Sequence, residues 1–99
     1  MAEKLDSETI LKRIKKEKRE LKKRGLKKIG LFGSYAKNKQ KQKSDIDFLV
    51  EFKTIDLDKY LYVLNLLEKL FRRKIDLVIE KDLKPELIYV KKEAKYVKI

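Results

Sequence analysis

A glycine-serine pair and three aspartates are the residues of this chain best suited to chemistry. Ten residues separate Gly33-Ser34 from Asp45, a single residue separates Asp45 from Asp47, and Asp76 follows in a later apolar run. A glycine lets the backbone come close to a ligand, and a serine adds a hydroxyl donor. Carboxylates are the side chains that hard divalent cations prefer. The set therefore predicts chemistry on a nucleotide.

The two closely spaced aspartates stand at the start of a predicted strand, residues 46–52. Successive side chains of a strand point to opposite faces of the sheet, so Asp45 and Asp47 share one face while Ile46 and Phe48 occupy the other. The two carboxylates are then one pleat repeat apart, roughly 7 Å. This spacing suits oxygen ligands of Mg²⁺, which binds a few carboxylates together with water and substrate phosphates.

The glycine-serine pair ends a shorter predicted strand, residues 28–32. A short helix that begins near Tyr35 would direct its positive end at an anion, and the free N–H groups of the turn would bind it. We therefore expect Gly33 and Ser34 to contact phosphate.

Asp76 is the only acid in a third apolar run, residues 74–79. Burial of an unpaired carboxylate is costly, so we expect a cation, a hydrogen-bond network or a shared metal to neutralise it. In a site with two metal ions, Asp76 could also orient or deprotonate the acceptor hydroxyl.

The combined pattern resembles the minimal nucleotidyltransferases of the polymerase-β-like superfamily over nearly all of residues 26–94. The motifs that carry the likeness are Gly33-Ser34-Tyr35-Ala36, Ser44-Asp45-Ile46-Asp47-Phe48-Leu49-Val50 and Ile75-Asp76-Leu77-Val78. The resemblance implies Mg²⁺-dependent transfer of a nucleoside monophosphate, with Gly33 and Ser34 on the phosphates. It also implies that Asp45, Asp47 and Asp76 are both the catalytic acids and the ligands of two Mg²⁺ ions.

Two further positions are assigned to nucleotide binding, Lys37 and Ser44. Lys37-Asn38 stands where an Arg-Gly pair is common in the family; lysine keeps the charge but lacks the planar guanidinium fork. Lys37 begins a basic group that continues with Lys39, Lys41 and Lys43 between the phosphate turn and the acids. Ser44 either contacts substrate or closes the turn before Asp45.

Small members of this family resemble antitoxins paired with HEPN-type ribonuclease toxins. The resemblance implies transfer of AMP from ATP to a hydroxyl, a tyrosine of such a toxin, by a protein that acts as its antitoxin. The alternative is a non-catalytic antitoxin or nucleotide-binding module that neutralises its partner by docking. In both cases we expect a hetero-oligomer with the toxin.

Composition limits the remaining possibilities. The 99 residues hold 28 Lys and Arg against 16 Asp and Glu, a net charge of +12, which attracts polyanions. We expect the basic residues of the first helix to form a solvated face, with nucleic-acid binding as the less favoured alternative. The absence of Cys and His excludes disulfides, thiolate zinc sites and Ser-His catalysis. No signal sequence or membrane span is apparent, so we expect a cytoplasmic protein without membrane contact.

The predicted elements form a single α/β (α+β) domain over residues 1–99, with an N-terminal helical part, 1–25, and a motif-bearing core, 26–94. We expect a helix over 7–24 with Ser7 as N-cap, and another over 57–72. A last helix should begin at Pro85, with Leu87, Ile88 and Val90 packed inward, before an extended tail. The elements predict a mixed sheet of three to four strands with helices mainly on one face, the nucleotidyltransferase fold.

Overall fold

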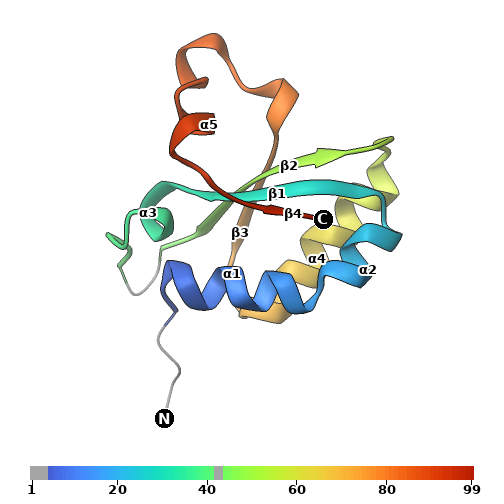
Figure 1. The fold of residues 1–99 in the computed structure, drawn as a ribbon, viewed down its shortest axis with the longest axis horizontal. Coiled ribbons are helices and arrows are strands. Elements are labelled where there is room, and N and C mark those ends of the chain that lie inside the picture. The colour runs from blue at the N-terminus through green and yellow to red at the C-terminus, as the bar shows by residue number, and fades with distance from the viewer. Residues whose placement is uncertain (1–4, 42–43) are drawn as a thin grey trace.

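A mixed four-stranded sheet organises the chain, with its strands in the order β3-β2-β1-β4 (Figure 1). The computed structural model describes residues 5–41 and 44–99. Strand β2 runs antiparallel to β1 and parallel to β3, and β4 runs antiparallel to β1. The elements in chain order are α1 (Ser7–Lys16), α2 (Lys18–Lys23), β1 (Leu26–Phe32), α3 (Gly33–Ala36), β2 (Ile46–Phe52), α4 (Leu57–Phe71), β3 (Ile75–Ile79), η1 (Glu80–Asp82), η2 (Pro85–Leu87), α5 (Val90–Glu93) and β4 (Lys95–Lys98).

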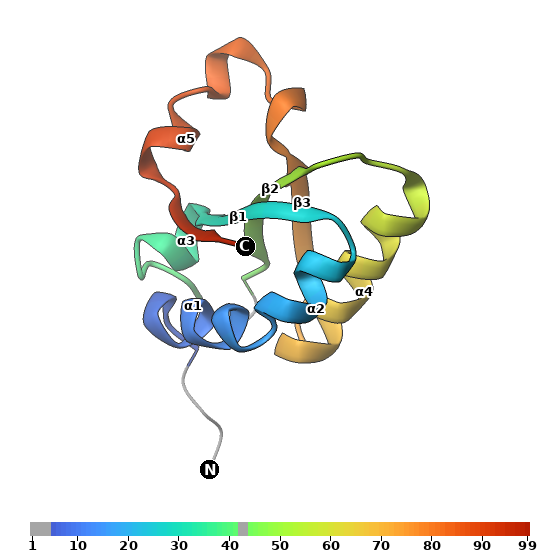
Figure 2. The same cartoon turned by 45° about the vertical axis from the view of Figure 1, so that its right-hand side comes forward.

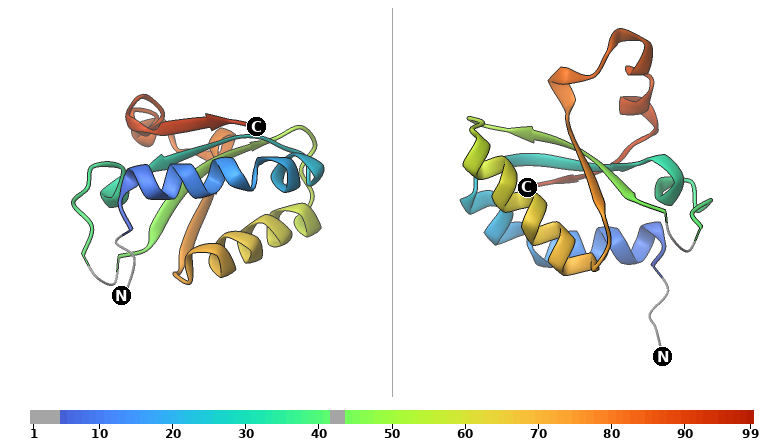
Figure 3. Two further views of the ribbon diagram at one scale, coloured as in Figure 1. Left: turned by 60° about the horizontal axis from the view of Figure 1, so that its bottom comes forward. Right: turned by 180° about the vertical axis from the view of Figure 1, so that it is seen from behind.

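Helices α1, α2 and α4 cover one face of the sheet, as the side views show (Figure 3). Alternation along the strands sends the larger apolar side chains to this face, where they meet the apolar stripes of the helices. The fully buried side chains of the resulting core include Ile10, Ile14, Leu21, Ile29, Leu31, Ile46, Phe48 and Leu67. The predicted α+β fold with helices mainly on one face is thus confirmed.

The N-terminal helix differs in two details from the one predicted. It is divided by Glu17 into α1 and α2, and its N-cap is Asp6, not Ser7. The Asp6 carboxylate accepts a hydrogen bond of 2.8 Å from the Thr9 backbone N–H. A carboxylate at this position also complements the positive end of the helix, and Ser7 becomes the first helical residue.

The opposite face of the sheet is covered by the segment between β3 and β4, which we call the arch (residues 80–94). It consists of η1, η2 and α5 and rises over the sheet on the side away from α1 and α2 (Figures 1 and 2). The predicted helix from Pro85 is therefore wrong in length, and Leu87 and Ile88 are 40% and 48% exposed instead of packed inward. Only Val90 of the three is buried.

The sequence predicted an extended tail for the last residues, without assigning them to the sheet. Val97 instead pairs with Ile29 of β1 and is buried in the core, so the C-terminal residues complete the sheet as β4. Beside it, the Tyr96 ring packs against Gly30, where a Cβ atom would stand 2.7 Å from the ring. Among the described residues, no helix is long and apolar enough to cross a membrane.

Candidate active site

The predicted acids meet on the face of the sheet that carries the arch. Asp47 of β2 pairs in register with Asp76 of β3 on one side and with Phe32, the last residue of β1, on the other. Paired residues of adjacent strands point to the same face, and the strands are about 4.8 Å apart. Asp45 precedes β2 and is exposed beside them. The structure therefore brings all three predicted acids together.

Burial and like charge raise the pKa of Asp47 to about 6. Burial has the largest effect, followed by the charges of Asp76 and Asp45 and a hydrogen bond with Asp76. The acid expected to be buried was Asp76, but that residue is exposed and Asp47 is the half-buried one. The reason is position in the sheet, since β3 is an edge strand whereas β2 is flanked by β1 and β3.

Gly33 is required by its contact with one of these acids. Its φ is +74°, in the left-handed region that glycine tolerates best, and a Cβ atom at this position would clash with the Asp47 carboxylate. The backbone turn and the acids thus lie in direct contact, as the predicted phosphate and metal sites require. The next residue, Ser34, is half-buried. Tyr35 is buried in the core, where its role is packing.

The other two predicted nucleotide-binding residues have protein partners in this structure. The Lys37 Nζ lies 3.4 Å from Glu93 Oε2, an ion pair that links the end of α3 to the arch. The Ser44 Oγ accepts a hydrogen bond of 2.8 Å from the Lys41 backbone N–H, so it closes the turn before Asp45. Lys43 lies outside the described residues.

A cleft of about 350 Å³ opens between the arch and the site. The strands and α3 contribute one side of its lining and the arch the other; the first side consists of Phe32, Gly33, Lys37, Asp76 and Val78, and the second of Leu83, Leu87, Tyr89, Val90 and Glu93. The volume is within the range of small-molecule sites, and a mainly apolar wall with a few converging polar groups is typical of them.

Sequence reasoning missed the group that holds the arch in place. Glu80, whose side chain is only 15% exposed, lies 3.4 Å from Lys28 Nζ and 3.6 Å from Lys91 Nζ. It also accepts a hydrogen bond of 3.1 Å from the Tyr96 hydroxyl, and burial together with this bond raises the pKa of Tyr96 to about 12. The available signal was spacing, because Glu80 follows Asp76 by four residues and so continues the alternation of β3 directly after its last residue.

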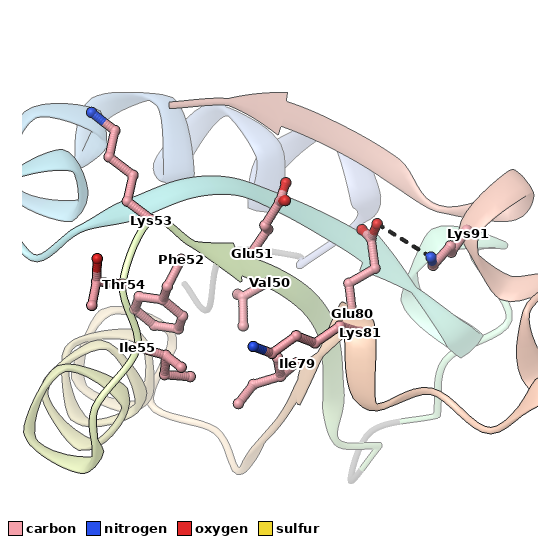
Figure 4. A pocket seen from close by; sticks show the side chains of 10 residues that line it. All are labelled: Val50, Glu51, Phe52, Lys53, Thr54, Ile55, Ile79, Glu80, Lys81 and Lys91. Carbon is pink, nitrogen blue, oxygen red and sulfur yellow. Dashed lines mark ion pairs between the residues drawn. The ribbon is translucent and has the colours of Figure 1, made fainter.

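A second pocket, of about 570 Å³, lies near the far ends of β2 and β3 (Figure 4). Its lining includes Glu51, Lys53, Glu80 and Lys91 but none of the three aspartates. Glu51 is four residues from Asp47, roughly 13 Å along an extended strand. Glu51 therefore belongs to this second pocket and not to the acidic group.

The donor set fits a divalent cation, although no ready-made metal group of three or more Asp, Glu, His or Cys side chains is found in residues 5–41 and 44–99. Three carboxylates supply the oxygen ligands that Mg²⁺ prefers. Burial, and after it the charges of Asp76 and Asp45, raise the pKa of Asp47, and a bound cation would favour its charged form.

Comparison with known proteins agrees with the geometry. Residues 8–97 match the family model described as polymerase beta, nucleotidyltransferase. The protein adenylyltransferase MntA of Thermococcus cleftensis is 42% identical over 78 residues, which cover 78% of this chain and 77% of that protein. The prediction of a nucleotidyltransferase is thereby confirmed.

Solved structures give the same result for the fold. One described as a candidate minimal nucleotidyltransferase has a TM-score of 0.80 at 29% identity and covers 95% of this chain and 98% of its own. A toxin-antitoxin crystal structure with AMP-PNP has a TM-score of 0.65 at 26% identity, covering 93% of this chain and 72% of its own. The chain therefore has the fold of the minimal nucleotidyltransferases.

Proposed function

Because the chain belongs to the polymerase β nucleotidyltransferase family, we propose that it transfers AMP from ATP to a protein hydroxyl. The observation that carries the proposal is the contact of the Gly33 turn with Asp47, beside Asp76 and Asp45. A phosphate-sized turn and three carboxylates in one place are the parts that such a transfer needs. A relative named protein adenylyltransferase, 42% identical, supports the choice of reaction.

In this proposal the acids have different roles, which follow from their exposure. Asp47, half-buried between two strands, and Asp45 would hold Mg²⁺. Bound there, the metal would stabilise the charge that develops on the attacking and leaving oxygens. Asp76 is exposed and lines the cleft, so it is placed to orient the acceptor hydroxyl or accept its proton. Gly33 and Ser34 position the phosphates.

The proposed acceptor is a tyrosine of a HEPN-type toxin, which the chain silences as an antitoxin. Two observations support a protein partner: a structural neighbour is a toxin-antitoxin complex with AMP-PNP, and the arch exposes Leu87, Ile88 and Tyr89 next to the cleft. Exposed apolar side chains beside a site are typical of a protein contact. The same surface would also serve a non-catalytic antitoxin that acts by docking, which is the second candidate.

The test is transfer of label from α-labelled ATP to the toxin, with intact mass as a second readout. Asp45→Asn/Asp47→Asn should lower the transfer rate at least about 10³-fold, because it removes several kcal/mol of metal-dependent stabilisation. The matched control is Asp58→Asn/Asp82→Asn, which removes the same charge at two exposed positions outside the cleft.

Two results separate the candidates. Loss of label and loss of toxin neutralisation in the Asp45/Asp47 variant, but not in the control, would establish the enzyme as the antitoxin. Neutralisation that survives in that variant while label is lost would favour docking. Equal label from the variant and the wild type would contradict the proposed site.

A further inference from the structure

Five basic side chains line a shallow groove on the outer side of α1 and α2. They are Lys15, Lys16, Lys18, Arg19 and Lys22, and all five are exposed. The helices lie on the opposite side of the sheet from the arch and its cleft (Figures 1 and 2). A ligand in this groove would therefore leave the candidate active site open.

None of the five makes an ion pair or other polar side-chain contact within the part of the chain that the structure describes. Their neighbour Arg24 is different, because it pairs with Glu20 at 3.5 Å and stacks on the Tyr62 ring at 3.7 Å. The groove thus concentrates positive charge without an internal counter-ion, and its mutual repulsion is relieved only by an external anion.

The burial of the apolar residues of the two helices disfavours a lipid surface as the occupant. An interfacial helix inserts an apolar face into the membrane boundary. Here Ile10, Ile14 and Leu21 are fully buried in the core of the protein. The outer side of the helices has charge but no free apolar stripe to insert.

The chemistry of the lining also disfavours an acidic protein as the occupant. The centre of a protein interface usually contains aromatic or aliphatic anchors in desolvated pockets. The lining of this groove consists of lysine and arginine alone. Such a lining suits regularly spaced, strongly hydrated anions, which are the phosphates of a nucleic acid.

We propose that this groove, which we call the basic groove, binds the phosphodiester backbone of a nucleic acid. Lys15 lies in the last turn of α1, and Lys18 and Lys22 lie one helical turn apart on α2. One such turn rises about 6 Å, close to two phosphate intervals of one duplex strand at ~3.4 Å each. The lining contains no Asn or Gln, the side chains that read adenine edges, and we propose that its lysines and arginine contact phosphates, so we expect little dependence on base sequence.

The test is the salt dependence of binding of the full chain to fluorescent 16-mers, as duplex RNA, duplex DNA and single-stranded RNA. Three to five phosphate contacts predict a slope of log K against log salt of about −3 to −4.5 for a duplex. Lys15→Gln/Lys18→Gln/Lys22→Gln should make this slope shallower by about 2 to 3. Tighter binding of one of the three oligonucleotides would identify the source of the phosphates.

The matched control is Lys69→Gln/Lys84→Gln/Lys98→Gln, which removes the same charge from three exposed lysines outside the basic groove. Its slope should stay within about 1 of the wild type. Equal losses in the two triple variants would show an effect of net charge alone and overturn the proposal. So would absence of binding at 50 mM salt, or equal binding of polyglutamate or anionic vesicles.

Transfer of AMP is measured in parallel on the same variants. The basic groove variant should keep wild-type transfer to the toxin, because its residues lie on the far side of the sheet. Failure of transfer in all forms would count against the proposed function without affecting the nucleic-acid result. Circular dichroism and a thermal melt of both triple variants exclude unfolding as the cause of any loss.

Discussion

The two faces of the sheet differ in polarity: one is apolar and the other is charged. The face under α1, α2 and α4 is apolar, with Ile14, Phe48 and Leu67 fully buried. The face under the arch carries Asp47 and Asp76, and Glu80 at the start of the arch ties this cover to Lys28 of β1 and Tyr96 of β4. Apolar burial is the dominant favourable term in folding, whereas close like charges oppose it.

This difference indicates that stability and chemistry are assigned to separate faces. In a chain of 99 residues the core is small, so most of its stability should come from the helix-covered face. The arch face can then accommodate an unfavourable cluster of carboxylates for function. Such local conflict with stability is expected at functional sites.

The largest effect is expected from a change in the helix-covered face. Leu67→Ala, at a side chain with no exposed surface, should lower the free energy of unfolding by about 2–5 kcal/mol through lost burial and a cavity. Urea denaturation measures this. The control on the same helix, Leu61→Ala, changes a side chain that is 42% exposed and should cost much less. Transfer by the folded fraction should be unaffected in both, and a loss of activity beyond the unfolded fraction would break the division between faces.

The next effect concerns the contact between the phosphate turn and Asp47. Gly33→Ala should lower kcat/KM about 100-fold. The added Cβ would push the Asp47 carboxylate out of position, and a misplacement of about 1 Å in a catalytic group can cost this much in rate. The control is Gly25→Ala, since Gly25 also has a positive φ, +84°, but its Cβ would meet only the Lys59 side chain at 3.6 Å or more. Both variants should lose about 1 kcal/mol of stability to backbone strain. Equal activities would show that the close approach to Asp47 has no catalytic importance.

A smaller effect should appear in the pH dependence of stability without added metal. The pKa of Asp47 is about 6 in the folded protein against about 3.9 when unfolded, so the folded state binds more protons between these values. The contribution of Asp47 to stability is therefore lost as pH rises through 6. Asp47→Asn should be more stable than wild type by about 1–2 kcal/mol at pH 8, after allowance for solvent screening, and the gain should shrink toward pH 4.

Chemical denaturation at a series of pH values measures this gain. Asp58→Asn provides the control, because Asp58 is exposed on α4 and should give a difference near zero throughout. A gain for Asp47→Asn that is the same at pH 4 and pH 8 would show that ionisation of the half-buried Asp47 is not its cause.

The smallest effect should come from the ion pair at the mouth of the cleft. Glu93→Gln frees Lys37 from its partner, and an exposed pair is worth about 0.2–1 kcal/mol. The KM for ATP should therefore fall about two- to threefold, with kcat little changed. Glu86→Gln, on the exposed part of the arch, should leave the KM unchanged. A KM that rises in Glu93→Gln would mean that Glu93 positions Lys37 and does not compete with phosphate for it.

The sequence alone was sufficient for the elements that local pattern specifies. Strand β2 was predicted with its observed bounds, Ile46–Phe52, because period-two alternation and flanking polar residues define it. The helix over 57–71 was found from the spacing of its apolar residues. The nucleotidyltransferase family was recognised from motif residues whose spacing is set by strand ends and turns.

Local pattern was insufficient for the C-terminal part of the chain. Residues 95–98 have few apolar side chains, and they become a strand only because β1 offers an unpaired edge. The apolar residues of the arch, Leu87 and Ile88, indicated a packed helix, yet they are exposed. Whether these side chains are buried depends on the distance between the arch and the sheet. That distance is set by tertiary structure and cannot be predicted from local residue preferences.

For the site, the sequence determined which oxygen donors are present and which two share a strand face. Tertiary structure decided the rest. Parallel pairing of β2 with β3 places Asp76 beside Asp47, and the central position of β2 buries Asp47 in preference to Asp76. The contact of Gly33 with Asp47 and the ion pairs of Glu80 join residues far apart in the chain. Burial and charge proximity arise only when strands distant in sequence are brought together, which is why the pKa of Asp47 belongs to the fold and not to the motif.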